Sequence, residues 1–561
     1  KMAASTLSVS PIAFTSRRSD AVGRRGLVAS SQGLATEAGI RILRQGGNAA
    51  DAAVAVAAAL AVTEPTSTGL GGDAFALWYD AKSQSVECMQ GGGRSPEGLT
   101  LEVIKSAGGL GERSGLAVVV PGAAAAWEDT IARWGKLSLE TVLEPAIELA
   151  DGGFPVAPVT ATLWGRQEGL LREKGSKALL NAEGRAPRAG ELFRNPDLAN
   201  TMRRMQKVGA KAGYYNGFVA RAMEAAVAAN GGVLTQADLA AHETLFPEPI
   251  SASYRGKLRI WQVPPPNSGV AALVALNVLD RIYPAPSPGS DAAALGPERM
   301  HAMVEAMRLG FADALKSCGD GVDTTETLSA EAAEARAVLF SADEAMSQES
   351  LERDPLRKEG PDTVYFCVVD GEGNACSFIN SNYDGFGTGI VPDGCGFPLQ
   401  NRGYNFNTEP GHPNCAAPRK RPYHTIMPGM VTEEGSGDLF CAGGVMGGFM
   451  QPQGHLQVFS AMADFGLSPQ AALDLPRFCL QGVDSTVAGA GTLRGAAVLL
   501  EEGVPAGTAE ALRAKGQNVV EGVSGWDRTV FGRGQVIRRD PKTGVLFGGT
   551  DPRSDGCALG F

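Results

Sequence analysis

Thr363 lies at the point where the character of the chain changes most sharply. Residues 323–360 are polar, acidic and poor in large apolar side chains, which is typical of a mobile loop or linker. Residues 364–369 are apolar on both faces, which predicts a buried strand. A cut between Asp362 and Thr363 would leave an α-amino group, with an ordinary pKa of about 7.7, beside the threonine hydroxyl as its general base. The junction is compatible with an N-terminal threonine nucleophile, but threonine before a strand is also commonplace.

The sequence offers few competing sites for catalysis. No Gly-x-Ser-x-Gly segment provides a serine nucleophile. The nine cysteines are scattered, without a Cys-x-x-Cys pair, and the five histidines lack His-x-x-x-His spacing, so neither a disulfide scaffold nor a structural zinc site is indicated. Cys367 and Cys376 fall in expected strands, where a small buried apolar residue is the simpler interpretation. We therefore expect chemistry that needs no metal and no organic cofactor.

The elements that must position Thr363 are partly visible in the sequence. Helices are predicted at residues 36–44 and, with Asn48 as N-cap, from 49 to 62. A Gly-rich turn at 66–73 leads into a strand at 74–79, and a turn at 370–374 joins the strand after Thr363 to a returning strand at 375–379. Further helices are expected at 137–151, 195–208 and 292–314.

Composition excludes several classes of protein. The chain has 561 residues, 44% hydrophobic and 20% charged, which is ordinary globular usage. The net charge of −11 and the lack of a sustained basic run argue against nucleic-acid binding. The longest apolar run, at 49–62, is shorter than the ~20 residues of a membrane-spanning helix. We expect a soluble cytoplasmic protein with a flexible segment at 1–25, whose Ser- and Arg-rich composition is also compatible with an organelle transit peptide.

A series of ordered motifs resembles the gamma-glutamyltranspeptidase family. The matching segments, in order, are GGNAADAA (46–53), EP (64–65), GLGGD (69–73), DTVYFCVVD (362–370), GNA (373–375), FGTG (386–389), RP (421–422), GG (447–448) and DPRS (551–554). The resemblance covers roughly residue 13 to the end. Segments 378–382, 400–403 and 450–455 are similar to the branch that contains cephalosporin (glutaryl-type) acylases and oxamate amidohydrolase.

The resemblance implies a fold and a set of reacting groups. Members are N-terminal-nucleophile hydrolases with an α/β fold, an αββα four-layer sandwich, made as one chain that cuts itself into two associated subunits. By that pattern, residues 26–362 would form the large subunit, with a mobile linker at about 323–362, and residues 363–561 the small one. Thr363 would be the nucleophile, Ser381 the hydroxyl that supports it, and Gly447 and Gly448 the oxyanion hole.

The substrate-binding positions depart from the family pattern. The family's aspartate for the substrate ammonium falls at Asn405, and its paired serines fall at His424 and Thr425. The family's carboxylate-binding arginine falls at Leu101, which leaves Arg94 as the nearest cation there. Asn382 and Arg402 complete the expected substrate-binding residues. Loss of one partner of a charge-assisted pair costs a few kcal/mol of discrimination.

Three hypotheses follow for function. The first is a gamma-glutamyltransferase-like hydrolase or acyltransferase that cleaves γ-glutamyl amides such as glutathione. The second keeps the mechanism but takes glutaryl amides or oxamate. The third is an unprocessed, non-catalytic scaffold, which the intact Thr363, Ser381 and Gly-Gly pair disfavour. The expected partners are a small amide substrate and the two subunits themselves, which could pair into a homodimer of the heterodimer.

Overall fold

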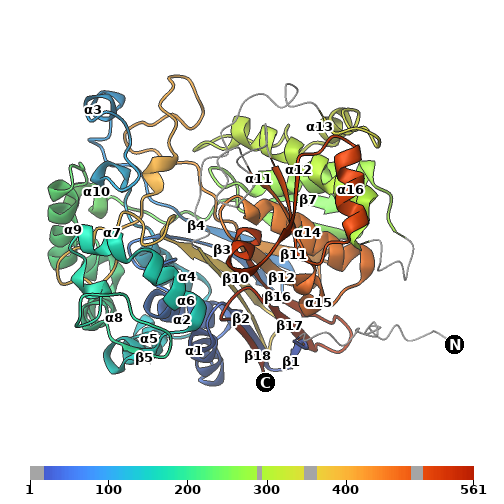
Figure 1. Cartoon of the computed structure of the whole chain (residues 1–561). Coiled ribbons are helices and arrows are strands. Elements are labelled where there is room, and N and C mark those ends of the chain that lie inside the picture. Colours follow the sequence, from blue (N-terminus) through green and yellow to red (C-terminus); the bar gives the residue numbers. More distant parts are fainter. Residues whose placement is uncertain (1–17, 287–293, 347–362, 482–496) are drawn as a thin grey trace.

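Two antiparallel sheets face each other at the centre of the molecule (Figure 1). This computed structural model describes residues 18–286, 294–346, 363–481 and 497–561. The first sheet has the strand order β18 (Cys557–Gly560), β2 (Gly26–Ser30), β9 (Val364–Asp370), β10 (Ala375–Ser381), β3 (Asp73–Asp80) and β4 (Ser85–Gly91). The second has the order β1 (Ala21–Gly23), β17 (Leu546–Thr550), β16 (Arg533–Arg539), β12 (Leu439–Met446), β11 (Gly429–Glu433), β8 (Leu258–Gln262) and β7 (Ile250–Tyr254). β9 packs against both β12 and β16 of the opposite sheet.

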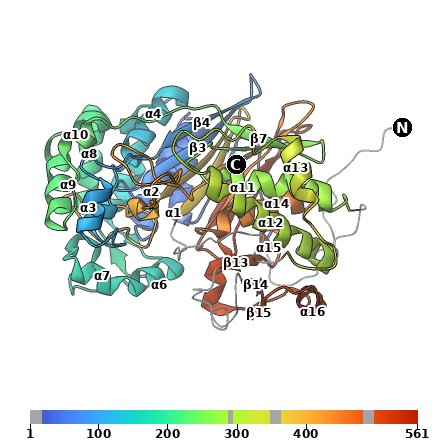
Figure 2. The same ribbon diagram turned by 90° about the horizontal axis from the view of Figure 1, so that it is seen from above.

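Helices cover the outer face of each sheet, as the view from above also shows (Figure 2). On the first sheet lie α1 (Gly33–Arg44), α2 (Ala49–Thr63) and α4 (Ala123–Trp134), with α5 (Leu139–Gly152) and α8 (Pro196–Gly213) outside them. On the second lie α11 (Gly269–Ile282), α14 (Met450–Phe465) and α15 (Pro469–Asp474), with α12 (Pro297–Ser317) and α13 (Ala330–Ala337) outside them. This arrangement confirms the expected αββα sandwich.

Further helices and two smaller sheets surround the four layers. The helices are α3 (Leu101–Ser106), α6 (Pro158–Arg166), α7 (Glu168–Glu173), α9 (Gly217–Ala229), α10 (Gln236–Ala240) and α16 (Ala506–Ala514). A two-stranded sheet pairs β5 (Phe154–Pro155) with β6 (Leu192–Phe193), and a three-stranded sheet contains β13 (Phe478–Gln481), β14 (Ala497–Glu501) and β15 (Val519–Val523). No helix in the described ranges has the length and apolar character needed to cross a bilayer.

The Ala-rich helix α2 supports the centre of the first sheet. All its residues are buried, and it packs against β9, β10, α1 and α5. Small alanine side chains allow neighbouring layers to approach closely on every side. As predicted, Asn48 is the N-cap: its side chain accepts from the amide nitrogens of Ala50 at 3.0 Å and Asp51 at 3.2 Å.

The β9–β10 hairpin occupies the middle of that sheet and sets the position of Thr363. Every residue of both strands is buried, as the apolar run predicts. Asp370 closes the turn by accepting from the amide nitrogens of Glu372 at 2.9 Å and Asn374 at 3.0 Å. The register pairs Val364 with Asn380. Thr363, one residue before β9, therefore lies beside the end of β10.

Two sequence expectations were wrong in part. The acidic stretch expected to be a loop contains helix α13, because Ser329 caps it and Ala and Glu are strong helix formers. The N-terminal segment expected to be flexible contains β1, which pairs with β17. Residues 1–17 and 347–362, including Asp362, lie outside the described residues.

Candidate active site

Thr363 and Ser381 form the centre of the site. Thr363 Oγ1 lies 3.0 Å from Ser381 Oγ, and both side chains are buried. Ser381 Oγ also accepts hydrogen bonds from the backbone nitrogen of Tyr383 at 2.9 Å and from Arg402 Nη2 at 3.3 Å. The hydrogen bond between the two hydroxyls fixes the side-chain rotamer of Thr363, and the two N–H donors in turn fix Ser381.

Gly447 and Gly448 form the turn between strand β12 and helix α14. Their φ values are +130° and +54°, which side chains with a Cβ rarely adopt. The strand that ends at this turn contacts the start of β9, because the backbone nitrogen of Tyr365 donates to Met446 Sδ at 3.1 Å. The turn therefore lies at the same end of the two sheets as Thr363, and at a helix N-terminus, where backbone N–H groups favour negative charge.

Arg402 brings a positive charge to the two hydroxyls. Arg402 is the first residue of the short 3₁₀ helix η5 (Arg402–Asn405), and it is fully buried. Its Nη1 donates to Thr425 Oγ1 at 2.9 Å. The guanidinium carbon lies 4.4 Å from the ring centroid of Tyr383, a cation–π distance. Nη2 also donates to Ser381 Oγ, which in turn contacts Thr363 Oγ1. Among the described residues, the charge of Arg402 is thus linked to Thr363 through a single side chain.

His424 and Asp73 form a buried pair next to Arg402. His424 Nε2 lies 2.9 Å from Asp73 Oδ2. Burial, and then the charge of Arg402, lower the pKa of His424 to about 4. The imidazole is therefore neutral at pH 7 and donates its Nε2–H to the carboxylate. Burial opposes ionisation of Asp73, but bonds from His424 and the Gly93 amide outweigh it and keep its pKa below the ordinary value.

The position of the family's ammonium-binding aspartate is held by a neutral amide. Asn405 is buried, and its Oδ1 accepts from the Tyr383 hydroxyl at 2.6 Å. Its Nδ2 donates to the carbonyl of Tyr423 at 3.2 Å. Tyr383 itself has a φ of +80°, a backbone conformation that is unfavourable for a residue with a large side chain. Among the described contacts of Asn405, none involves a carboxylate.

Two other predicted residues have different surroundings. Asn382 donates to the carbonyl of Pro65 at 3.3 Å, and a Cβ on Gly72 would lie 2.9 Å from its Oδ1, so Asn382 packs against the Gly-rich turn. Arg94 has a half-exposed side chain that pairs with Asp320 at 3.2 Å and donates to the carbonyl of Arg419 at 2.9 Å, and none of its described contacts involves Thr363. Sequence reasoning assigned no role to Asp73, although it ends the Gly-rich motif.

Comparisons with known proteins identify the family of this chain. The family model described as Gamma-glutamyltranspeptidase matches residues 35–561. A glutathione hydrolase-like proenzyme of Bacillus subtilis is 34% identical, covering 96% of this chain and 99% of its own. An oxamate amidohydrolase proenzyme of Klebsiella pneumoniae is 31% identical, and the match covers 96% of this chain and 99% of that protein.

Solved structures extend the likeness to the fold. The crystal structure of cephalosporin acylase from Bacillus halodurans is similar with a TM-score of 0.86 and 38% identity, over 98% of each chain. The similarity in sequence and in fold therefore extends along nearly the whole length of the chain. The chain belongs to the gamma-glutamyltranspeptidase family.

Proposed function

We propose that this chain is an autoprocessed amide hydrolase or acyltransferase whose nucleophile is Thr363. The observation that carries the proposal is the 3.0 Å contact between Thr363 Oγ1 and Ser381 Oγ, at the strand end that adjoins the Gly447–Gly448 turn. In the uncut chain the Thr363 nitrogen is a peptide amide, which is not a base. Hydrolysis of the bond between Asp362 and Thr363 converts it into an amine.

The two fragments would remain one fold after the cut. They contain 362 residues and, as 561 less 362, 199 residues. Strands β9 and β10 of the second fragment lie between β2 and β3 of the first within a single sheet. Separating the fragments would therefore break the buried β2–β9 and β10–β3 ladders, as well as the ladders β18–β2, β1–β17 and β11–β8, which is costly. The names of the relatives as proenzymes support such a maturation step.

The reaction passes through an ester of Thr363. The free α-amino group takes the hydroxyl proton while Oγ1 bonds to the amide carbonyl carbon, whose oxygen becomes an oxyanion. The backbone N–H groups of Gly447 and Gly448 donate to that oxyanion. The ammonium then protonates the leaving nitrogen as the C–N bond breaks. Water or an acceptor amine attacks the ester, which releases the acyl group and restores the hydroxyl.

The leading acyl donors are γ-glutamyl amides such as glutathione. The glutathione hydrolase-like relative supports this class. A γ-glutamyl group carries a carboxylate and an ammonium on one carbon, and each needs an opposite charge or several strong hydrogen bonds when it is buried. Arg402 is a suitable partner for the carboxylate.

A second class, glutaryl amides or oxamate, is favoured by one observation. Asn405 is neutral and already bonded to Tyr383 and Tyr423, so the expected acidic partner for an ammonium is missing. Acyl groups that carry a carboxylate but no ammonium need no such partner. The cephalosporin acylase and oxamate amidohydrolase relatives support this class.

A matched donor series tests the substrate assignment. On processed protein, kcat/KM is measured for a γ-glutamyl amide, the glutaryl amide with the same leaving group, and oxamate. We expect kcat/KM for the first two donors to differ by no more than about tenfold, which corresponds to ~1.4 kcal/mol. A larger difference would require a buried ion pair with the ammonium, and Asn405 does not provide the acid for one. A preference for γ-glutamyl above about a hundredfold would contradict the second class. Turnover of none of the three would contradict both classes.

A further inference from the structure

Arg477 is a buried arginine that binds two backbone carbonyls near the catalytic glycines. It lies just before β13, with a side chain that is 1% exposed. Nη1 donates to the carbonyl of Phe531 at 2.9 Å and to that of Gly532 at 3.3 Å. Nη2 donates to Asp551 Oδ2 at 2.7 Å and to the carbonyl of Leu473 at 3.2 Å. One guanidinium thus joins four points of the backbone and side chains.

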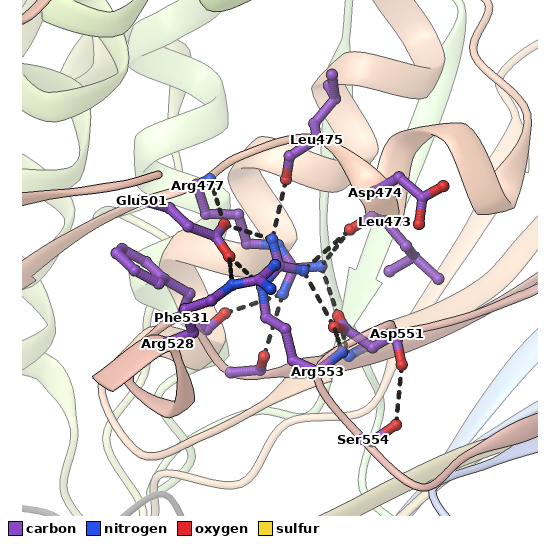
Figure 3. A network of polar contacts seen from close by, with 12 residues as sticks. Leu473, Asp474, Leu475, Arg477, Glu501, Arg528, Phe531, Asp551, Arg553 and Ser554 are labelled. Carbon is purple, nitrogen blue, oxygen red and sulfur yellow. Dashed lines mark hydrogen bonds and ion pairs between the residues drawn. The ribbon is translucent and has the colours of Figure 1, made fainter. Parts of the chain in front are cut away.

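A compact set of charges holds Arg477 in place (Figure 3). Glu501 Oε2 accepts from the backbone nitrogen of Arg477 at 3.0 Å, while Asp551 binds its guanidinium. Arg553 joins these two acids, with Nε 2.8 Å from Glu501 Oε1 and Nη1 3.0 Å from Asp551 Oδ1. Burial opposes ionisation of Asp551, but the charges of Arg477 and Arg553 outweigh it and lower its pKa. The pairing fixes both ends of Arg477.

Gly532 connects Arg477 to the turn that contains Gly447. It follows the 3₁₀ helix η7 (Gly525–Phe531) and has a φ of +68°. A Cβ on Gly532 would lie 2.3 Å from the carbonyl oxygen of Met446, and a Cβ on Gly447 would lie 3.0 Å from the Gly532 Cα. The backbone of Gly532 therefore packs directly against the backbone of the Met446–Gly447 segment, with the side chains of Val445 and Met450 beside the contact. A shift of the Gly532 backbone toward this segment would therefore require Gly447 to move as well.

We propose that Arg477 is a positioning residue for the oxyanion hole. By holding the carbonyls of Phe531 and Gly532, it keeps the Gly532 backbone pressed against the Met446–Gly447 segment and so fixes the direction of the Gly447 and Gly448 N–H groups. None of the described contacts of Arg477 involves Thr363. The inference rests on the proposed function, because it presumes that these two glycines stabilise an oxyanion.

Arg528, and not Arg477, is the member of the charged set that is exposed to solvent. Arg528 is 39% exposed, and its Nε donates to Glu501 Oε1 at 2.7 Å. Arg477 and Arg553 are almost fully enclosed. A lysine at 477 would keep the charge facing Asp551 but could not span two carbonyls and a carboxylate with a planar fork. Arg477→Lys therefore removes the positioning contacts with the least loss of charge balance.

The test compares kcat and KM of Arg477→Lys with those of a matched variant. Arg255→Lys is the control, since Arg255 is also largely buried, pairs with Asp464 and donates to the carbonyl of Tyr283, but lies beside the outermost strand β7. Rates are normalised to the processed fraction on a denaturing gel. We expect Arg477→Lys to lower kcat at least about tenfold with KM within about threefold, because oxyanion donors act mainly in the transition state. Arg255→Lys should keep kcat within about twofold.

Two outcomes would overturn the proposal. One is a kcat for processed Arg477→Lys within about twofold of the unaltered enzyme, and the other is an equal loss in Arg255→Lys. If Arg477→Lys does not fold, Gly532→Ala decides by the same criteria, because its methyl group would push directly on Met446. A failure of the proposed function would look different: the Thr363→Ala variant would keep the turnover of the unaltered enzyme.

Discussion

The hydroxyl of Ser381 lies 3.0 Å from that of Thr363 although the two residues are separated by a complete β-hairpin. The register of β9 and β10 brings the two residues side by side, because Thr363 precedes one strand and Ser381 ends the other. The proposed nucleophile is thus positioned by the middle of a sheet that has helices on one side and a second sheet on the other.

Ser381→Ala should slow both self-cleavage and turnover at least about tenfold. The substitution removes the partner of Thr363 Oγ1 and leaves the Tyr383 amide and Arg402 without their shared acceptor, a loss typical of broken buried networks. Ser377→Ala is the matched control: Ser377 lies on the same strand, is equally buried and accepts from Gly429 N at 3.0 Å. It should lower the melting temperature without the rate loss. Equal rates for the two variants would contradict the role of Ser381.

Gly448→Val should lower turnover of processed protein by about 10²–10³, the usual effect of losing an oxyanion donor. A β-branched residue at φ +54° would force the turn to rearrange. Gly466→Val tests strain alone, because Gly466 has a φ of +67° at the opposite end of the same helix and open space around it. That control should lose stability and keep its rate. Near-full turnover by Gly448→Val would contradict the role of Gly448 as an oxyanion-hole donor.

Asn405→Asp should shift donor preference toward γ-glutamyl amides by at least about tenfold relative to glutaryl amides. The new carboxylate retains an acceptor for the Tyr383 hydroxyl and adds the charge that an ammonium requires. Asn407→Asp, a similar change in the same loop at a residue that binds the backbone nitrogen of Glu409, should leave the ratio unchanged. The ratio of kcat/KM for the two donors decides; an unchanged ratio in Asn405→Asp would place the ammonium elsewhere.

His424 should make the fold less stable in acid. Its pKa is about 4 in the fold, against an ordinary value of about 6.5, so between these pH values the unfolded chain binds the extra proton. The contribution of the neutral His424 to the free energy of unfolding is therefore complete above about pH 6.5. Roughly 3 kcal/mol of it is lost as the pH falls through 4.

Urea unfolding of His424→Gln at pH 7 and pH 4.5 measures this contribution. The variant should lose less stability between the two pH values than the unaltered protein does. His412→Gln, at a half-exposed histidine, should change the difference much less. An identical pH dependence in His424→Gln and the unaltered protein would show that His424 does not titrate in this way.

Local patterns predict the parts of the fold that are decided locally. Asn48 before an Ala-rich run marks the start of α2, and the apolar run after Thr363 marks β9, because capping and strand burial depend on neighbouring residues. The same reasoning missed α13, since low hydrophobicity was given more weight than a Ser cap and good helix formers.

Contacts between distant segments were beyond such reasoning. The pair of Asp73 with His424 joins residues 351 positions apart, and only the packing of β3 against the loop before β11 creates it. Family likeness pointed to His424 but not to its partner. It also suggested Arg94, whose half-exposed side chain pairs with Asp320, and a substrate-binding role for Arg94 stays a prediction.

The identity of the nucleophile is tested most directly by the intact masses of the purified chain and of Thr363→Ala. We predict that the unaltered chain gives two masses, for fragments of 362 and 199 residues, and that the shorter fragment begins with Thr363. Thr363→Ala should give a single mass for the full chain. Cleavage at the same bond in Thr363→Ala, or turnover by an unaltered chain that stays whole, would contradict the account.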